Sequence, residues 1–183
     1  MADGGAKGHD PIARWLNKHS HEVMQGTMAV MLLVGDHDTV HDTGATFDGM
    51  LTSLTAAEAL KLVIDQPRPR QPSATDGFPS SHSAAAFAFA RGLSDWRSSW
   101  SAAVYAFAAG VGWARVEEGY HTPEQVLAGA ALGVWVAGAS LESNGFLLHR
   151  GDGPAAFAGS SERSDGCEGF AGGPSVVLWR RAW

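Results

Sequence analysis

Three short segments of this chain carry residue types that could together bind a phosphate group. The first has a Lys and an Arg-Pro pair with six residues between them, and the second is a Pro-Ser-Ser-His run. The third has an Arg, five residues, a His, three residues and a Gln. The candidate ligands for phosphate are Lys61, Arg68, Ser80, Ser81 and Arg115, and the remaining polar candidates are His82, His121 and Gln125.

The cations in these segments suit the charge of a phosphoryl group in transfer, which is spread over three equatorial oxygens. Arg68 and Arg115 can each bind two oxygens through a planar fork, and Lys61 adds a point charge. The hydroxyl of Ser80 and the backbone N–H of Ser81 can donate further hydrogen bonds. Any one segment alone would be weak evidence, because each has an ordinary reading as a solvated loop, a helix cap or a surface lysine.

The order and spacing of the segments resemble the signature of the type 2 phosphatidic acid phosphatase and vanadium haloperoxidase superfamily. That signature is Lys-x6-Arg-Pro, then Pro-Ser-Gly-His, then Ser-Arg-x5-His-x3-Asp, and the resemblance covers residues 52–141. It implies that His121 attacks phosphorus to form a phosphohistidine and that His82 protonates the leaving oxygen. It also implies a phosphatase that needs no metal or other cofactor.

Three positions depart from the signature: Ala114 replaces a Ser, Ser81 replaces a Gly, and Gln125 replaces the Asp that would orient the nucleophilic His. The amide oxygen of Gln125 can accept the Nδ1–H of His121, but it carries no full charge. Thr122 to Gln125 also match a helix capping box, so capping and His orientation fit the spacing equally well.

The substitutions at Ser81 and Gln125 are similar to the pattern in dolichyl diphosphatases and plastid lipid phosphate phosphatases. This resemblance implies a lipid or isoprenoid phosphate as the substrate. Two alternatives stay open: a phosphate- or lipid-binding pseudo-enzyme on the same scaffold, and a vanadate-dependent haloperoxidase, although haloperoxidases are usually far longer chains.

The elements that must position these residues are helices, because alternating runs of β-branched residues are absent from the sequence. We predict an all-α bundle of about five to six helices with the active site at helix ends. The expected helices are 11–20, 22–34, 46–64, 82–94, 98–115 and 123–141. The polar stretch 36–44 and the proline-rich stretch 67–79 are expected to be loops.

The composition indicates one helical domain with tails. We predict an N-terminal tail and first helix in residues 1–20, a phosphatase domain in 21–148, and a Gly-, Ser- and Pro-rich tail in 149–183. The net charge of −6 and the lack of a basic stretch argue against nucleic acid as a partner. With a single Cys, Cys167, the chain has no intramolecular disulfide and no Cys-based zinc site.

The composition alone does not decide whether the protein associates with a membrane. Residues 98–114 and 126–141 are free of charges but fall short of the roughly 20 residues that a spanning helix needs. The mean hydropathy of −0.08 is low for a protein with many spans. A soluble bundle and a membrane protein with closely packed small residues fit almost equally well, and the family resemblance favours the membrane.

Overall fold

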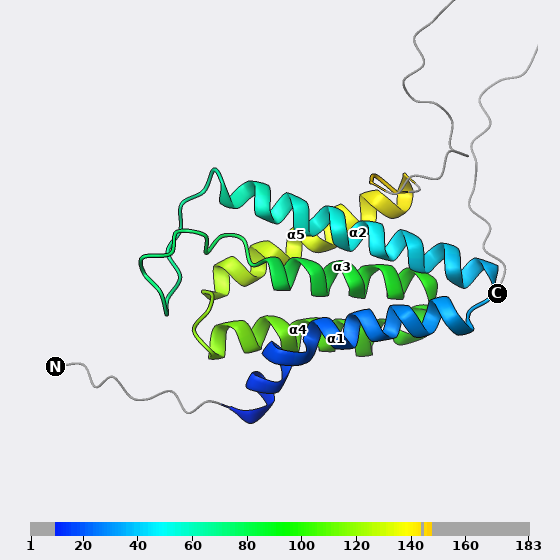
Figure 1. The fold of residues 1–183 in the computed structure, drawn as a ribbon, viewed down its shortest axis with the longest axis horizontal. Helices are drawn as coiled ribbons and strands as arrows, with labels where there is room; N and C mark the ends of the chain where they lie inside the picture. Colours follow the sequence, from blue (N-terminus) through cyan, green and yellow to red (C-terminus); the bar gives the residue numbers. More distant parts are fainter. Residues whose placement is uncertain (1–9, 144, 148–183) are drawn as a thin grey trace, which may run out of the picture. The chain divides into compact units, whose positions relative to one another are not determined.

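The structure is a computed structural model that describes residues 10–143 and 145–147. These residues form five α-helices and one short 3-10 helix (Figure 1). The helices are α1 (Pro11–Val34), α2 (His37–Lys61), α3 (Ser81–Trp96), η1 (Ser98–Trp100), α4 (Ser101–Glu117) and α5 (Pro123–Glu142). The prediction of an all-α bundle is confirmed. The expected tail 149–183 lies outside the described residues, so its boundary stays a prediction.

α3 is the central helix of the bundle and packs against α2, α4 and α5. Most of its small side chains are fully buried, and two glycines of α5 allow the backbones to come very close. A Cβ on Gly129 would collide with the carbonyl oxygen of Ser80, and a Cβ on Gly133 would collide with that of Ala84. This close packing holds the first turns of α3 and α5 next to each other.

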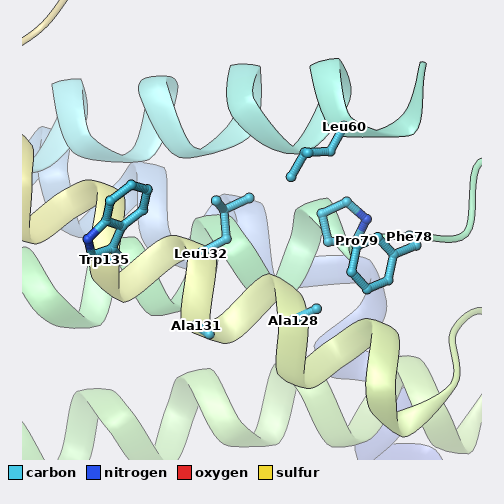
Figure 2. Close-up of a pocket in the computed structure, with 7 residues that line it drawn as sticks. All are labelled: Leu60, Phe78, Pro79, Ala128, Ala131, Leu132 and Trp135. Atoms are coloured by element: carbon cyan, nitrogen blue, oxygen red, sulfur yellow. The ribbon is translucent and has the colours of Figure 1, made fainter. Parts of the chain in front are cut away.

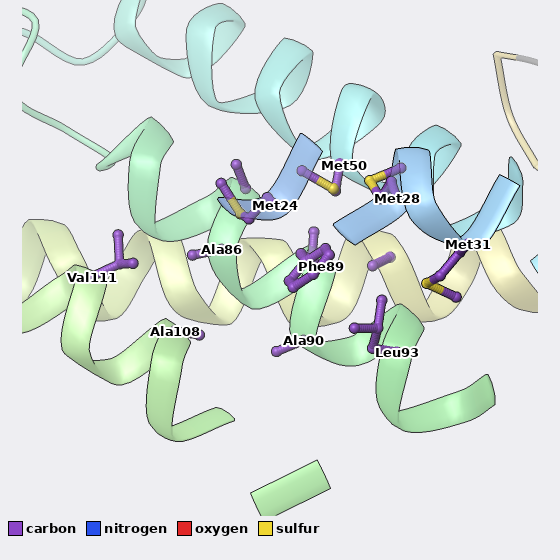
Figure 3. Packing of buried hydrophobic residues seen from close by; sticks show 13 residues of the cluster. Met24, Met28, Met31, Met50, Ala86, Phe89, Ala90, Leu93, Ala108 and Val111 are labelled. Atoms are coloured by element: carbon purple, nitrogen blue, oxygen red, sulfur yellow. The ribbon is translucent and has the colours of Figure 1, made fainter. Parts of the chain in front are cut away.

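The apolar core surrounds α3 and is formed with α1, α2, α4 and Ala137 of α5 (Figure 3). Methionines of α1 and α2 fill the space around the ring of Phe89, with Leu93 and Val111 beside them. Methionine is flexible and fills irregular gaps, which suits helices whose other core positions are mostly alanine. α1 itself packs mainly on α4 and also contacts α2.

Two predictions about the N-terminal half are wrong. The stretch 36–44 is not a loop, because α2 begins at His37 and Asp36 caps it by accepting hydrogen bonds from the N–H and the hydroxyl of Thr39. Polar residues fit this helix because Thr43 bonds back to the carbonyl of Thr39 and is buried. The expected helices 11–20 and 22–34 are one continuous helix, α1.

The three motif segments meet at one end of the bundle (Figure 1). α2 ends at Lys61, α3 begins at Ser81, α4 ends at Glu117, and α5 begins at Pro123. The long loop between α2 and α3 folds back on itself, since Gln66 donates its N–H to Thr75 and accepts the N–H of Gly77. The prediction that each motif lies at a helix boundary is confirmed.

α5 is the one helix among the described residues that is long and apolar enough to cross a membrane. Its apolar window has a mean hydropathy of 1.3, and 39% of that window is buried inside the bundle. The core helix of a soluble protein can have the same length and composition, so this helix alone is weak evidence for a membrane protein.

Candidate active site

His121 lies in the turn between α4 and α5 and is almost fully buried. Its Nδ1 is 2.9 Å from the carbonyl oxygen of Gly77 and 3.2 Å from Oε1 of Gln125. Both oxygens can only accept, so Nδ1 carries the proton and Nε2 keeps its lone pair. This tautomer is the one that a nucleophilic imidazole needs.

Gln125 makes both of the contacts that its spacing allows. Its Oε1 accepts the N–H of Thr122 at 3.1 Å, completing a capping box, and it also lies against His121. Its Nε2 donates to the carbonyl oxygen of Pro67 at 3.1 Å. A backbone N–H on one side and a backbone carbonyl on the other fix which way the amide points, so Oε1 faces the imidazole.

His82, in the first turn of α3, accepts a hydrogen bond from Arg115. The guanidinium Nη2 is 2.7 Å from Nδ1 and 3.2 Å from Nε2 of His82, and because a guanidinium can only donate, the imidazole is the acceptor. Burial, and then the nearby charge of Arg115, lower the pKa of His82 to about 3. Burial likewise lowers the pKa of His121 to about 4, although its bond to Gln125 acts in the other direction.

Arg115, in the last turn of α4, is held on several sides and is 8% exposed. Nη1 donates to Oδ1 of Asn17 at 3.1 Å, and the guanidinium lies over the ring of Tyr120 at 4.8 Å. Burial lowers its pKa to about 10. Its buried Nε–H has no hydrogen-bond partner among the described residues, so this donor is available to an anion.

Lys61 lies at the end of α2 and contacts the start of α3. Its ammonium is 2.8 Å from a carboxylate oxygen of Glu58 and 2.5 Å from Oγ of Ser81. Ser81 also donates to Glu58 at 2.6 Å. The hydrogen bonds that Glu58 accepts from Lys61 and from Ser81 lower the pKa of Glu58. The side chain that replaces the family glycine at position 81 therefore joins the lysine to a carboxylate.

Arg68, in the loop after α2, forms a two-pronged ion pair with Asp76. The N–O distances are 2.8 Å and 2.7 Å, and the pairing lowers the pKa of Asp76. Arg68 is close enough to His121 and Arg115 for its charge to lower the pKa of both.

Ser80 acts as the N-cap of α3, and its hydroxyl is fully buried. The hydroxyl accepts the N–H of Ser83 at 3.4 Å and bonds to the hydroxyl of Ser83 at 3.0 Å. Its backbone N–H donates to the carbonyl oxygen of Gln125, which joins α3 to α5. The expected contact between this hydroxyl and phosphate stays a prediction.

The eight residues singled out from the sequence thus gather at one end of the bundle. Residues that the motifs did not indicate contact them, among them Asn17, His21, Glu58, Asp76 and Gly77. Glu58 could have been suspected, because it precedes Lys61 by three residues on one helix face. The contacts of the others depend on how loops and helices pack, and the sequence carries no local signal for them.

An apolar groove of about 330 Å³ begins beside these residues and runs along α5 (Figure 2). Its lining is Leu60, Phe78, Pro79, Ala128, Ala131, Leu132 and Trp135. Leu60 directly precedes Lys61 and Pro79 directly precedes Ser80, so neighbouring residues line the groove and the polar site. The volume is within the range of pockets that bind small ligands, roughly 300–1,000 Å³.

Within the described residues, no group of three or more His, Cys, Asp and Glu side chains is arranged to hold a metal ion. The positive charge around His82 and His121 comes from side chains of the chain itself, through Arg115 and the lysine and arginine of the first segment.

Comparison with known proteins gives one match. No curated protein and no solved structure matches the chain. The family model of the PAP2 superfamily matches residues 46–146, which include all three motif segments and more than half of the chain. The chain therefore belongs to the PAP2 superfamily, whose members are phosphatases.

Proposed function

We propose that this protein is a metal-independent phosphatase that hydrolyses a lipid or isoprenoid phosphate or diphosphate through a phosphohistidine. The observation that carries the proposal is the fixed tautomer of His121, whose Nδ1–H contacts Gly77 and Gln125 while Nε2 keeps its lone pair. A nucleophile needs such a free lone pair, next to cations that stabilise the charge on phosphate.

In the first step, Nε2 of His121 attacks phosphorus, and the bond from phosphorus to the leaving oxygen breaks. His82 gives its proton to that oxygen. In the second step, water attacks the phosphohistidine and His82 takes up a proton, which releases inorganic phosphate and restores His121. The oxygens of Gly77 and Gln125 stabilise the partial positive charge on the imidazole with dipoles, where the family pattern has a carboxylate.

His82 must be protonated to act as the acid, yet its pKa without a ligand is about 3. The positive charge of Arg115 is one cause of this low value. A phosphate dianion bound at Arg115 would oppose that charge and raise the pKa of His82. On this account the charge of the bound substrate makes His82 take up a proton from solution, and His82 then acts as the acid.

The buried Nε–H of Arg115 supports an anionic ligand. A buried donor without a partner costs roughly 1–3 kcal/mol, and a phosphate oxygen would remove that cost. Ion pairs with Glu58 and Asp76 hold Lys61 and Arg68 near the site before the ligand arrives.

The groove along α5 supports an apolar chain on the substrate. It begins beside the phosphate residues, and exposed apolar side chains lie on the same helix, with Leu127 67% and Trp135 74% exposed. Exposed apolar surface of this extent is typical of surfaces that meet lipids or partners. We therefore propose that the protein associates with a membrane, where α5 would face the lipid.

The test is phosphate release from three substrates: phosphatidate, a polyprenyl diphosphate and a water-soluble phosphomonoester. We expect the wild-type chain to prefer one of the two lipids, to keep its activity in EDTA, and to be inhibited by vanadate. His121→Ala should release no phosphate.

Loss of activity in EDTA would overturn the metal-independent mechanism, and equal rates on all three substrates would overturn the lipid specificity. Phosphate binding without turnover by the wild-type chain would favour a pseudo-enzyme. Bromide oxidation with vanadate and peroxide would favour a haloperoxidase.

A further inference from the structure

A helix that none of the three motifs includes reaches into the candidate site. α1 ends before residue 46, where the family match begins, yet Asn17 contacts Arg115 and His21 contacts His82. Asn17 and His21 are four residues apart and so lie on one face of α1. We propose that this face completes the active site, with Asn17 as a positioning residue for Arg115 and His21 as one for His82.

Asn17 connects α1 to the last turn of α4 through both ends of its amide. Nδ2 donates to the carbonyl oxygen of Ala114 at 3.0 Å, and Oδ1 accepts from Nη1 of Arg115 at 3.1 Å. A carbonyl can only accept and a guanidinium can only donate, so the amide has one possible orientation. Asn17 is therefore locked against the backbone next to the arginine that it holds.

This contact decides which edge of Arg115 is left for an anion. Nη1 is taken by Asn17, Nη2 donates to His82, and the ring of Tyr120 covers one face. Nε is the buried guanidinium nitrogen that has no partner among the described residues. Without Asn17, the guanidinium would lose one of the hydrogen bonds that fix its orientation, and Nε and Nη2 would be held less firmly in one direction.

His21 contacts the other end of the same pair. Its ring meets the ring of His82 edge to face, with 4.6 Å between centroids and 66° between planes. Burial, and then the nearby charge of Arg115, lower the pKa of His21. Besides burial, the charges of four neighbours lower the pKa of His82: Arg115, His21, His121 and Lys61. The ring of His21 thus packs against the imidazole that accepts the hydrogen bond from the arginine.

This inference rests on the proposed function, but Asn17 can be tested without turnover. Binding of inorganic phosphate to the full chain is measured by titration calorimetry for wild type, Asn17→Leu and Asn17→Asp. Asp is close in volume to Asn, and Leu has the same branching at Cγ with a larger volume. We expect Asn17→Leu to weaken phosphate binding by roughly tenfold, because a hydrogen bond to a charged group is lost.

Asn17→Asp should weaken phosphate binding further, since a carboxylate beside Arg115 would compete with the anion. Gln25→Glu is the matched control, because it makes the same change of charge on an exposed position of α1 and should bind phosphate within about twofold of wild type. Affinity for Asn17→Leu within twofold of wild type, or any other order of the variants, would overturn the role of Asn17.

His21 should affect turnover more than phosphate affinity, because it supports the acid His82. We expect His21→Ala to lower kcat roughly tenfold with phosphate affinity little changed, and His21→Phe, which keeps a ring, to restore most of kcat. His19→Ala on the same helix is the control. Unchanged kcat in His21→Ala, or equal loss in both variants, would overturn the role of His21 as a packing partner.

The outcomes separate this inference from the proposed function. A wild-type chain that binds phosphate but hydrolyses none of the three substrates would overturn the proposed function, while the Asn17 variants still test the contact with Arg115. Wild-type activity with unchanged Asn17 and His21 variants would overturn this inference alone. A wild-type chain that does not bind phosphate would overturn both.

Discussion

Two clusters of polar side chains are buried in this bundle, and they differ in how their partners are arranged. Asp48 of α2 accepts hydrogen bonds from the hydroxyl of Ser140 at 2.6 Å and from the N–H groups of Phe146 and Leu147 at 2.8 Å. In each of these contacts an oxygen of the Asp48 carboxyl group accepts from an O–H or N–H donor. The cluster joins the end of α5 to α2 and is complete as it stands.

The cluster around Arg115 lies at the other end of α5, and its polar groups are not all paired with complementary partners among the described residues. A guanidinium faces His82 and lies near His121, and both imidazoles have pKa values far below their ordinary range. One buried N–H has no partner among the described residues. The difference fits a structural role for Asp48 and supports the proposal that the Arg115 cluster binds an anion at a cost in stability.

The strongest contrast between the clusters should come from the proposed nucleophile. We expect His121→Asn to lower kcat by roughly 10³-fold or more, because the covalent step is lost, while the melting temperature changes little. Phosphate release and thermal unfolding are measured on the same sample. A variant that keeps a tenth of wild-type activity would contradict the assignment.

A second prediction concerns the loop that holds Gln125. A Cβ on Gly77 would lie 2.6 Å from Nε2 of Gln125 and 2.7 Å from the carbonyl oxygen of Gln66. Gly77→Ala should therefore shift the amide and the imidazole it contacts, and lower kcat by roughly 10- to 100-fold. Gly26→Ala is the control, since nothing lies within 4 Å of its Cβ, and it should be fully active. Equal activity of the two variants would count against the role of Gln125.

The Asp48 cluster should show the reverse behaviour. Asp48→Asn places amide hydrogens opposite donors and should cost about 2–4 kcal/mol of unfolding free energy. At a temperature where the variant is folded, its kcat should equal that of wild type. Asp38→Asn, an exposed change on the same helix, should cost less than about 1 kcal/mol. Denaturant unfolding measures both, and loss of activity in folded Asp48→Asn would remove the distinction between the clusters.

The smallest expected effect is a dependence of stability on pH. His121 has a pKa of about 4 when folded and an ordinary value near 6.5 when unfolded. Between these values the unfolded chain binds more protons, so stability is greatest above pH 6.5 and falls as the pH drops towards 4. His82 extends the loss towards pH 3.

The check is denaturant unfolding of wild type and His121→Asn between pH 7 and pH 4.5. The unfolding free energy should fall less steeply with decreasing pH in the variant, because the variant lacks one buried imidazole that resists protonation. Added phosphate should stabilise the wild type. Identical slopes in both chains would show that His121 is not held neutral by the fold.

Much of this site could be predicted because local rules fix it. Ser80 and Thr122 are good N-cap residues, and Pro123 follows at the first helical position, so the starts of α3 and α5 could be read from the sequence. The capping box also predicted one contact of Gln125. These signals depend on neighbours within four residues along the chain.

What could not be predicted depends on packing between distant segments. The polar stretch 36–44 looked like a loop, but capping by Asp36 and burial of Thr43 make it helical. Asn17 is far from Arg115 in sequence, and nothing in its neighbourhood indicates that it faces an arginine. The spacing fitted two roles for Gln125, helix capping and orientation of His121. Its amide makes both contacts because the N–H of Thr122 and the carbonyl oxygen of Pro67 fix its direction.

The most direct test of the account is to trap the covalent intermediate. The wild-type chain is mixed with a substrate labelled at the transferred phosphate, quenched within milliseconds, and mapped by digestion. The account predicts label on His121, stable in alkali and lost in acid, and no label in His121→Asn. Label on another residue, or turnover without any labelled intermediate on His121, would contradict it.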